Sequence, residues 1–210
     1  MLECVQRVMN MTKVLKKDKK EEVCQAISNG EVVAFPTETV FGVGVKFGDK
    51  EALDKLMEAK DRDYSKAVTL MVPSKEDIEK YAYVTDQARK IIDRYMPGMM
   101  TLIFKRKEEV DSYMTNGKET IGIRIPNDEY VLSLLESVGP MLVTSANLSG
   151  RPNTTTTLEV LRQLDGRISI VVDGKTTDNV ASTVVDVSQE DIKILREGKI
   201  RKEDILEVLK

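Results

Sequence analysis

Apolar and polar positions along the chain follow two patterns, one typical of strands and one typical of helices. Short apolar runs, often β-branched and closed by proline or glycine, predict strands at residues 31–35, 40–45, 67–72, 99–104, 120–125, 141–144, 168–172, 183–187 and 192–195. Apolar residues at helical spacing predict helices at residues 20–29, 49–59, 74–82, 86–95, 130–138 and 158–164, and a last one from residue 203. Strands and helices mix without strict βαβ alternation, so the sequence predicts an α/β fold with a twisted, open, mixed sheet flanked by helices.

Local signals mark where several of these helices start and stop. Asp49 stands at the N-cap position of the helix at 49–59. Ser74, with Asp77 three residues later, forms a capping-box-like start for the helix at 74–82. Gly30 follows the first helix as a stop signal. The predicted boundaries therefore rest on capping chemistry as well as on periodicity.

The length and the linkers indicate one domain. A chain of 210 residues fits a single domain, and it contains no internal repeat and no low-complexity linker. The segment before the first helix ends in a lysine-rich run that includes Lys16, Lys17, Lys19 and Lys20, which indicates a solvated stretch. We therefore expect residues 1–20 to form an N-terminal extension and residues 21–210 to form the catalytic domain.

Composition narrows the class of protein. Hydrophobic residues make up 41% of the chain and charged residues 32%, which is typical of a globular protein with a buried core. The net charge of -3 disfavours generic duplex binding, although charges can still gather on one face. No apolar run reaches the ~18 residues of a membrane span, and Cys4 and Cys24 lack metal-ligand spacing. We therefore expect a cytoplasmic protein with reduced thiols and no membrane partner.

The chain has no histidine, and this excludes several kinds of chemistry. Ser-His-Asp and Cys-His catalysis both need an imidazole, and most zinc sites use one. Any catalysis must then rest on lysine, arginine, carboxylates, hydroxyls, backbone amides and a metal brought by a substrate.

The first polar block follows the predicted strand at 31–35. It comprises Pro36, Thr37, Glu38 and Thr39, and it leads into a segment punctuated by Gly42 and Gly44. Hydroxyls and a carboxylate at the end of a strand are placed where ligands commonly meet α/β sheets. Glycine lets the backbone approach a ligand closely, but a plain polar turn between two strands explains the same residues equally well.

The second block lies at the end of the predicted helix at 49–59. Lys60, Arg62 and Lys66 fall within seven residues, a grouping that suits a polyphosphate. Cations at the C-terminus of a helix also complement its dipole without binding anything. Taken alone, this block favours the second interpretation.

The remaining two blocks follow strands in the C-terminal half. The residues at 143–150 are rich in hydroxyls and amides, including Ser145 and Asn147, and such loops present donors to phosphate and ribose oxygens. The same residue types also favour ordinary turns. The segment from Ser182 to Asp186, followed by Arg196, reads either as a binding segment or as strand edges with one solvated arginine.

Taken in order, the four blocks resemble the YrdC-like threonylcarbamoyl-AMP synthase family in its single-domain form. The resemblance spans residues 30–198. Its motifs are Pro36-Thr37-Glu38-Thr39, Lys60-x-Arg62, Ser145-x-Asn147 and Ser182-Thr-Val-Val-Asp186, together with Arg124 and Arg196.

The resemblance implies a fold with a large basic cleft and a specific reaction. L-threonine, bicarbonate and ATP would give threonylcarbamoyl-AMP and pyrophosphate, the first step of N6-threonylcarbamoyladenosine (t6A) modification of tRNA. Lys60 and Arg62 are the expected catalytic residues. The expected threonine-binding residues are Thr37, Thr69, Arg124, Val143 and Ser182. The expected ATP-binding residues are Lys60, Tyr64, Lys66, Thr120, Ser145, Asn147, Asn153 and Arg196.

Mg²⁺ is expected to arrive with ATP, since magnesium usually binds to substrate phosphates and not to an all-protein cage. No residue is expected to hold a metal on its own. A downstream tRNA-modifying transferase is the expected partner.

The chain departs from the family pattern at five positions. Phe41 replaces the usual tyrosine, Asp63 and Ala67 replace two prolines, Thr69 replaces a frequent histidine, and Ala181 replaces a proline. These changes leave the charged groups in place, but they support an alternative, a YrdC-like paralogue that binds RNA or a nucleotide without this activity. RNA binding ranks lower because only 5% of the residues are aromatic. A carbamoyl-transfer role like that of hydrogenase maturation proteins ranks third, because it normally belongs to a much longer chain.

Overall fold

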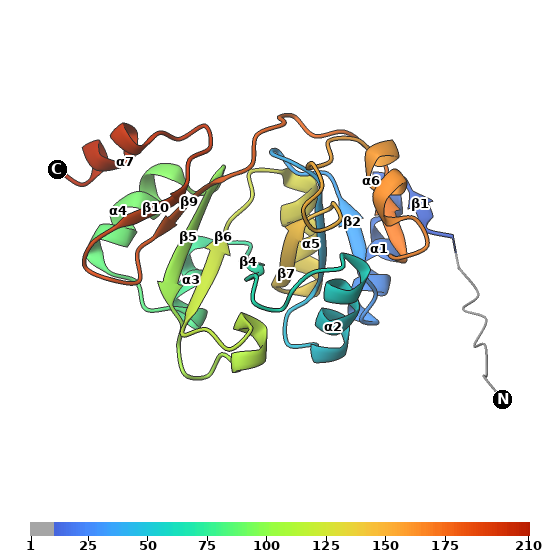
Figure 1. Cartoon of the computed structure of the whole chain (residues 1–210), viewed down its shortest axis with the longest axis horizontal. Helices are drawn as coiled ribbons and strands as arrows, with labels where there is room; N and C mark the ends of the chain where they lie inside the picture. Colours follow the sequence, from blue (N-terminus) through green and yellow to red (C-terminus); the bar gives the residue numbers. More distant parts are fainter. Residues whose placement is uncertain (1–10) are drawn as a thin grey trace.

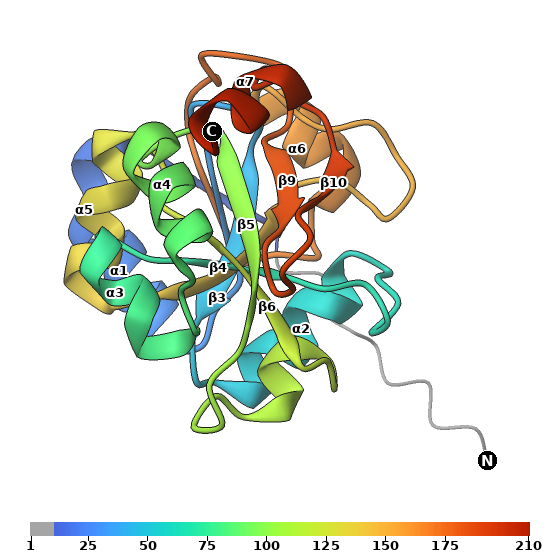
Figure 2. The same cartoon turned by 90° about the vertical axis from the view of Figure 1, so that its left-hand side faces the viewer.

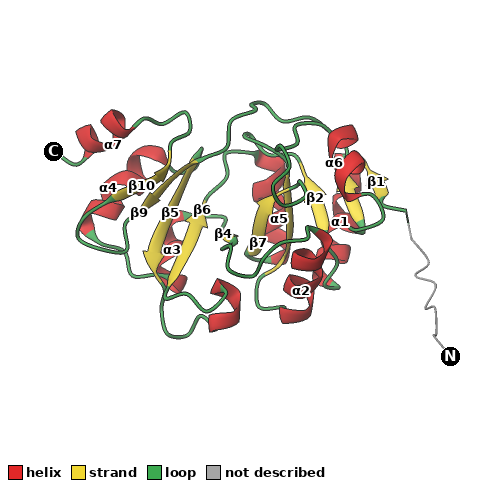
Figure 3. Cartoon of the chain, viewed as in Figure 1, coloured by secondary structure: helices red, strands yellow, loops and turns green. Residues whose placement is uncertain are grey.

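The computed structural model describes residues 11–210 and contains one large mixed sheet with helices on both sides (Figures 1 and 3). The strands are β1 (Lys13–Leu15), β2 (Val33–Phe35), β3 (Gly42–Lys46), β4 (Thr69–Met71), β5 (Met100–Lys105), β6 (Thr120–Arg124), β7 (Met141–Ser145), β8 (Ile170–Val172), β9 (Thr183–Asp186) and β10 (Lys193–Arg196). The α-helices are α1 (Lys20–Ser28), α2 (Lys50–Ala59), α3 (Lys75–Tyr81), α4 (Asp86–Tyr95), α5 (Glu129–Val138), α6 (Thr157–Leu164) and α7 (Lys202–Val208). Two 3-10 helices, η1 (Lys17–Lys19) and η2 (Ser112–Thr115), complete the described elements.

The sheet has the strand order β1-β8-β2-β3-β7-β4-β6-β5-β9-β10. Four neighbouring pairs are parallel (β1 with β8, β2 with β8, β4 with β6, β5 with β9), and the other five are antiparallel, among them β3 with β7 and β5 with β6. Strands β2 and β3 are adjacent in the sequence and in the sheet, whereas β8 is inserted from the far end of the chain. The predicted α/β fold with a mixed, open sheet is therefore confirmed.

Helices cover the sheet through two buried apolar clusters. Helices α1 and α5 contact each other, and Val23 and Leu134 belong to the smaller cluster with strand residues such as Val33. The larger cluster joins α2, α3, α4, α6 and α7 to the sheet, for instance through Leu56 and Ile91. In the view of Figure 2, α1, α3, α4 and α5 lie on one side of the strands and α2 and α6 lie on the other.

Helix starts are fixed by side-chain caps in several places. Asp49 accepts a hydrogen bond from the backbone N–H of Ala52, as its sequence position predicts. Thr85, Asp128 and Thr156 cap α4, α5 and α6 in the same way. At α3 the outcome differs, because the Ser74 hydroxyl donates to the Asp77 carboxylate at 2.8 Å and makes no cap to the helix backbone.

The described part of the N-terminal segment, residues 11–20, belongs to the sheet region. Residues 1–20 were expected to be an extension; within residues 11–20, β1 pairs with β8 as an edge strand and η1 leads directly into α1. Thr12 is buried, and its hydroxyl donates to the carbonyl of Ile168 at 2.9 Å. Strand β1 has only three residues, of which Lys13 and Val14 are exposed, so it is too short to show an alternating hydrophobic pattern in the sequence. Its hydrogen bonds to β8 define it as a strand. Cys4 lies outside the described residues.

Candidate functional site

A cavity of about 310 Å³ opens beside the turn between β2 and β3. Its walls come from that turn and from the strands β3, β4, β5, β6, β7, β9 and β10. The segments that follow α2 and β7 and the one that precedes β9 complete them. Nine of the residues expected to bind substrates line it: Thr37, Arg62, Thr69, Arg124, Val143, Ser145, Asn153, Ser182 and Arg196. The fold therefore brings together residues that are up to 159 positions apart in the sequence (196 minus 37).

Strand alternation explains how the sheet supplies one wall of this cavity. Successive side chains of a strand point to opposite faces. On β5, Thr101 and Ile103 line the cavity, while Leu102 between them is buried in the core. On β6, Arg124 lines the cavity, and Ile123 pairs with Leu102 in the core. At β5 and β6 the pleat therefore places core side chains on one face and cavity-lining side chains on the other.

The charged residues lining the cavity are all arginines. Within residues 11–210, Arg62, Arg124 and Arg196 line it, and no acidic side chain does. Burial lowers the pKa of Arg62, and burial together with the nearby charge of Arg124 lowers the pKa of Arg196. Arginine remains protonated despite such shifts, so these are partly desolvated positive charges. An anionic ligand placed among them would relieve their mutual repulsion.

Arg62 is held at one point and has a donor to spare. Its Nη2 donates to the carbonyl oxygen of Ala67 at 2.8 Å, which fixes the guanidinium against the segment leading to β4. Its Nε is buried, and no described residue accepts a hydrogen bond from it. A buried N–H without a partner is costly, so this nitrogen is suited to receive an oxygen of a ligand.

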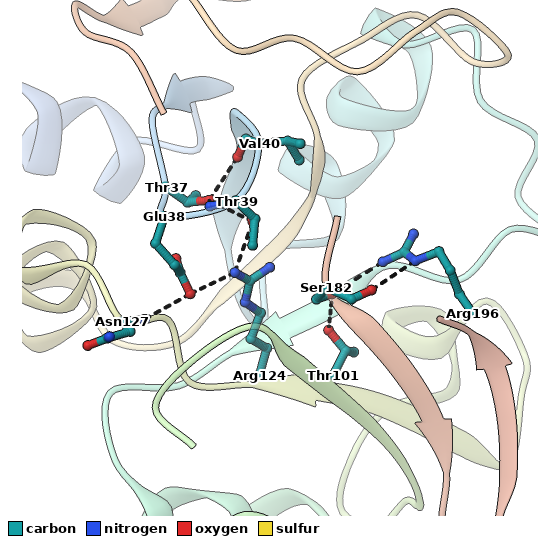
Figure 4. Close-up of polar contacts among 9 residues, drawn as sticks. All are labelled: Thr37, Glu38, Thr39, Val40, Thr101, Arg124, Asn127, Ser182 and Arg196. Atoms are coloured by element: carbon teal, nitrogen blue, oxygen red, sulfur yellow. Dashed lines mark hydrogen bonds and ion pairs between the residues drawn. The ribbon is translucent and has the colours of Figure 1, made fainter. Parts of the chain in front are cut away.

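Arg124 is held by the turn between β2 and β3. Its Nη2 donates to Oε1 of Glu38 at 2.8 Å and to Oγ1 of Thr39 at 2.9 Å (Figure 4). The backbone N–H of Asn127 also donates to Oε1 of Glu38, at 3.0 Å. The turn itself is closed by Thr37, whose hydroxyl donates to the carbonyl of Val40 at 2.8 Å. The first polar block is therefore an organised turn that anchors a cavity arginine.

A second polar group joins β5, β9 and β10. The hydroxyls of Thr101 and Ser182 lie 2.8 Å apart, and both residues are buried (Figure 4). Arg196 donates from Nε to the carbonyl of Ser182 at 2.9 Å and from Nη2 to its hydroxyl at 3.2 Å. These contacts hold the hydroxyl of Ser182 and the guanidinium of Arg196 side by side where β9 and β10 line the cavity.

Lys60 lies behind the cavity wall and not in it. It is only 1% exposed, and its Nζ donates to the backbone carbonyl oxygens of Ser145 and Asn147. Burial, helped by the charge of Arg62, lowers the pKa of Lys60 from 10.5 to about 7. The amine holds the loop after β7, and the expected contact of Lys60 with ATP stays a prediction.

Four further residues expected to bind ATP are placed outside the cavity lining. Tyr64 is 51% exposed, and its hydroxyl donates to Asp54 at 3.0 Å. Lys66 is exposed and donates to the hydroxyl of Ser149 at 3.1 Å. Thr120 opens β6 opposite Lys105. Asn147 is buried and donates to the carbonyls of Leu148 and Arg151, while its Oδ1 has no partner among the described residues.

Both glycines of the first block are closely packed, and one of them also lines the cavity. A Cβ on Gly42 would lie 3.0 Å from the side chain of Val143 and 3.1 Å from that of Phe35. Gly42 lines the cavity, whereas Gly44 does not. A Cβ on Gly44 would lie 2.9 Å from the side chain of Val143 and 3.0 Å from the carbonyl oxygen of Leu142. Glycine at 44 is therefore required by the close packing of β3 on β7, and the expected approach to a ligand concerns Gly42 alone.

The sequence analysis singled out no role for Thr101, Met71 or Ile103, which also line the cavity. A threonine inside the otherwise apolar strand at 99–104 was the available signal, because a polar residue in a buried strand usually faces a polar feature. The two apolar residues gave no signal, since core and cavity positions look alike in sequence.

The described residues provide no built-in metal site and no membrane-spanning helix. In residues 11–210 no group of three or more aspartate, glutamate or cysteine side chains is arranged to hold a metal ion. None of the helices in that range is long and apolar enough to cross a bilayer.

An open mixed sheet carries a cavity lined by three arginines and several hydroxyls, which defines an α/β protein with a pocket whose charge suits an anionic ligand. Comparison of the chain with known protein families identifies the family to which it belongs. Residues 25–198 match the Sua5/YciO/YrdC family model, described as telomere recombination, and the chain belongs to this family.

Relatives and solved structures agree with this assignment. Threonylcarbamoyl-AMP synthase of Bacillus subtilis is 37% identical over 187 residues, which cover 87% of this chain and 54% of the relative. The Vibrio campbellii protein of the same name is 33% identical over 183 residues, covering 85% of this chain and 98% of the relative. The crystal structure of Pyrococcus abyssi Sua5 complexed with L-threonine matches with a TM-score of 0.89 at 31% identity, over 95% of this chain and 61% of that one. The chain thus spans about half of the Bacillus subtilis relative and nearly all of the Vibrio campbellii one.

Proposed function

We propose that the protein is an L-threonylcarbamoyladenylate synthase, which joins L-threonine, bicarbonate and ATP and releases pyrophosphate. The observation that carries the proposal is the set of three arginines facing one cavity with hydroxyls and no acidic lining residue. Relatives that match most of this chain are named threonylcarbamoyl-AMP synthases, and a solved relative was crystallised with L-threonine. The product would be the first intermediate of t6A formation in tRNA.

The reaction needs neither a covalent nucleophile nor a histidine. The amine of threonine attacks the carbon of bicarbonate and loses water, which gives an N-carboxylate. An oxygen of this carboxylate attacks the α-phosphorus of ATP, and the bond to the β-phosphate oxygen breaks. That electron pair leaves with pyrophosphate. Positioning and charge neutralisation carry such a transfer, and a cavity lined by arginines and hydroxyls supplies both.

Each end of the cavity suits a different part of the substrates. Arg124, fixed by Glu38 and Thr39, would receive the carboxylate of threonine, with Ser182 close to it. Arg62 and Arg196 would neutralise the phosphates, where Arg62 offers its unpartnered Nε. Lys60 would act indirectly, by holding the carbonyls of Ser145 and Asn147 so that the loop keeps its shape.

Mg²⁺ fits this scheme as an ion carried by ATP. The cavity lining within residues 11–210 contains no carboxylate that would bind it directly, and magnesium usually binds through substrate phosphates. When bound there, it would neutralise charge on the triphosphate. The protein residues would contribute the arginines around that triphosphate.

Pyrophosphate release tests the proposal directly. The protein is incubated with ATP, Mg²⁺ and bicarbonate, with and without threonine, and serine and valine serve as control amino acids. Release that depends on threonine supports the synthase. ATP binding without threonine-dependent release would instead support the alternative, a family member that binds RNA or a nucleotide. Adding the tRNA-modifying transferase and tRNA then tests whether the product is passed on.

A further inference from the structure

Glu38 is a buried carboxylate that lies next to the cavity without lining it. It is 8% exposed, while its neighbours Thr37 and Thr39 both line the cavity. A buried carboxylate is costly unless it is paired, so its position calls for an explanation. Since it does not reach a ligand in the cavity, any contribution to binding must pass through another residue.

The residue through which Glu38 acts is Arg124. Oε1 of Glu38 accepts from Nη2 of Arg124 at 2.8 Å, and the same nitrogen donates to the hydroxyl of Thr39 at 2.9 Å. Because Nη2 carries two hydrogens, both are used by these two contacts. Figure 4 shows that the other terminal nitrogen of Arg124 points away from Glu38, toward the side where Ser182 lies.

The ion pair is not arranged for the greatest stability. Arginine and a carboxylate bind most strongly through two parallel hydrogen bonds. Here Oε2 of Glu38 and Nε of Arg124 are both buried and have no partner among the described residues. A single contact leaves part of the arginine's donor set unused, which suits an arginine that also has to bind a ligand.

A second positive charge makes this anchoring necessary. Arg196 lines the same cavity as Arg124, and burial together with the charge of Arg124 lowers the pKa of Arg196, so the two guanidinium groups repel each other. Glu38 is the only acidic residue bonded to Arg124 in residues 11–210. Without it, repulsion from Arg196 would favour other rotamers of Arg124.

We propose that Glu38 is the positioning residue for Arg124 and thereby sets the affinity for the carboxylate of the amino-acid substrate. Glu38 holds Nη2, so that Nη1 faces the cavity in the free protein and meets the carboxylate without a rotamer change. The identity of that carboxylate as threonine's rests on the proposed function. The phosphate end of the cavity, around Arg62, does not depend on Glu38.

The kinetic test compares Glu38→Gln and Glu38→Asp with a matched control, Glu79→Gln. Glu79 forms an exposed ion pair with Arg89 at 2.8 Å, so the control makes the same chemical change away from the cavity. We expect Glu38→Gln to raise KM for threonine by about tenfold, the loss of one well-placed charge contact, with KM for ATP nearly unchanged. Glu38→Asp, which keeps the charge, should fall between it and the wild type. Equal increases in both KM values, or an unchanged KM for threonine, would overturn the proposal.

A second measurement does not depend on turnover. Side-chain ¹⁵N–¹H signals of Arg124 report how fast its guanidinium rotates, and we expect slow rotation in the wild type and fast rotation in Glu38→Gln. Identical spectra would refute the positioning role even if the enzyme is active. A wild-type protein without threonine-dependent turnover, but with this difference in rotation, would refute the proposed function alone. If thermal melting shows that Glu38→Gln does not fold, Glu38→Asp decides both measurements.

Discussion

Because the amine of Lys60 is buried, we predict that the free energy of unfolding depends on pH. In the folded protein its pKa is lowered from 10.5 to about 7 by burial and by the charge of Arg62. The two carbonyl acceptors, on Ser145 and Asn147, match the two N–H bonds of a neutral amine. A third proton on the nitrogen would have no acceptor there. The neutral form is therefore well accommodated in the folded state.

The direction in which the free energy of unfolding changes with pH follows from how many protons each state binds. In the unfolded chain Lys60 keeps its proton up to about pH 10.5, whereas the folded protein loses it near pH 7. The unfolded state thus binds more protons between these values, and the free energy of unfolding rises with pH across that window. Between pH 6 and pH 9 this single group contributes an increase of about 3 kcal/mol, since each pH unit above pH 7 adds roughly 1.4 kcal/mol. Below pH 6 its contribution is constant.

Urea unfolding of the wild type and Lys60→Met between pH 6 and pH 9 checks this value. Methionine keeps an unbranched side chain of similar length and removes the titration. The absence of histidine reduces the number of other groups that titrate in this range. We expect the difference in unfolding free energy between the two proteins to change by about 3 kcal/mol in favour of the wild type as the pH rises from 6 to 9. Parallel curves would refute the reasoning, because they would mean that Lys60 has the same pKa in both states.

Three further predictions concern the cavity. Arg62→Ala should lower the turnover number by about 10²-fold, the usual cost of removing one preorganised charge contact. The control Arg89→Ala, on the outer surface, should leave the turnover number unchanged. Equal activities of the two variants would place Arg62 outside the site. Thr101→Val removes the hydroxyl that lies 2.8 Å from that of Ser182. We expect a loss of ~1 kcal/mol in unfolding free energy and a raised KM for threonine. An unchanged KM would limit Thr101 to a structural role. Gly44→Ala should destabilise the protein by ~1–3 kcal/mol, because the added Cβ would meet Val143 and Leu142. Gly139→Ala is the control for positive-φ strain alone, since no atom lies within 4 Å of a Cβ there. A melting temperature unaffected by Gly44→Ala would contradict the packing argument.

Capping chemistry and periodicity predicted most elements of the fold. The helix that starts after Asp49 begins at the predicted residue, and the strand predicted at residues 99–104 matches β5 to within one residue. These signals are local, because a helix start depends on a side chain three residues from the amide that it caps. The edge strand β1 was missed, since its pairing with β8 involves residues more than 150 positions away.

For the site, the family resemblance indicated Arg124 and Arg196 where the residue pattern alone left their role open, and both line the cavity together with Arg62. It did not determine that Lys60 is buried behind the wall, because a lysine beside an arginine reads the same whether it faces a ligand or a carbonyl.

The tertiary structure decided which groups pair and which remain available. Glu38 and Arg124 are 86 positions apart. In the sheet, β3, β7 and β4 lie between β2 and β6, so only the folded sheet brings the turn after β2 against the end of β6. Burial, desolvation and hydrogen-bond partners are properties of that assembled environment, and they set the charge state and orientation of each side chain. The sequence therefore determined the elements and the chemical types at the site. The packing of distant strands determined what each of those side chains does.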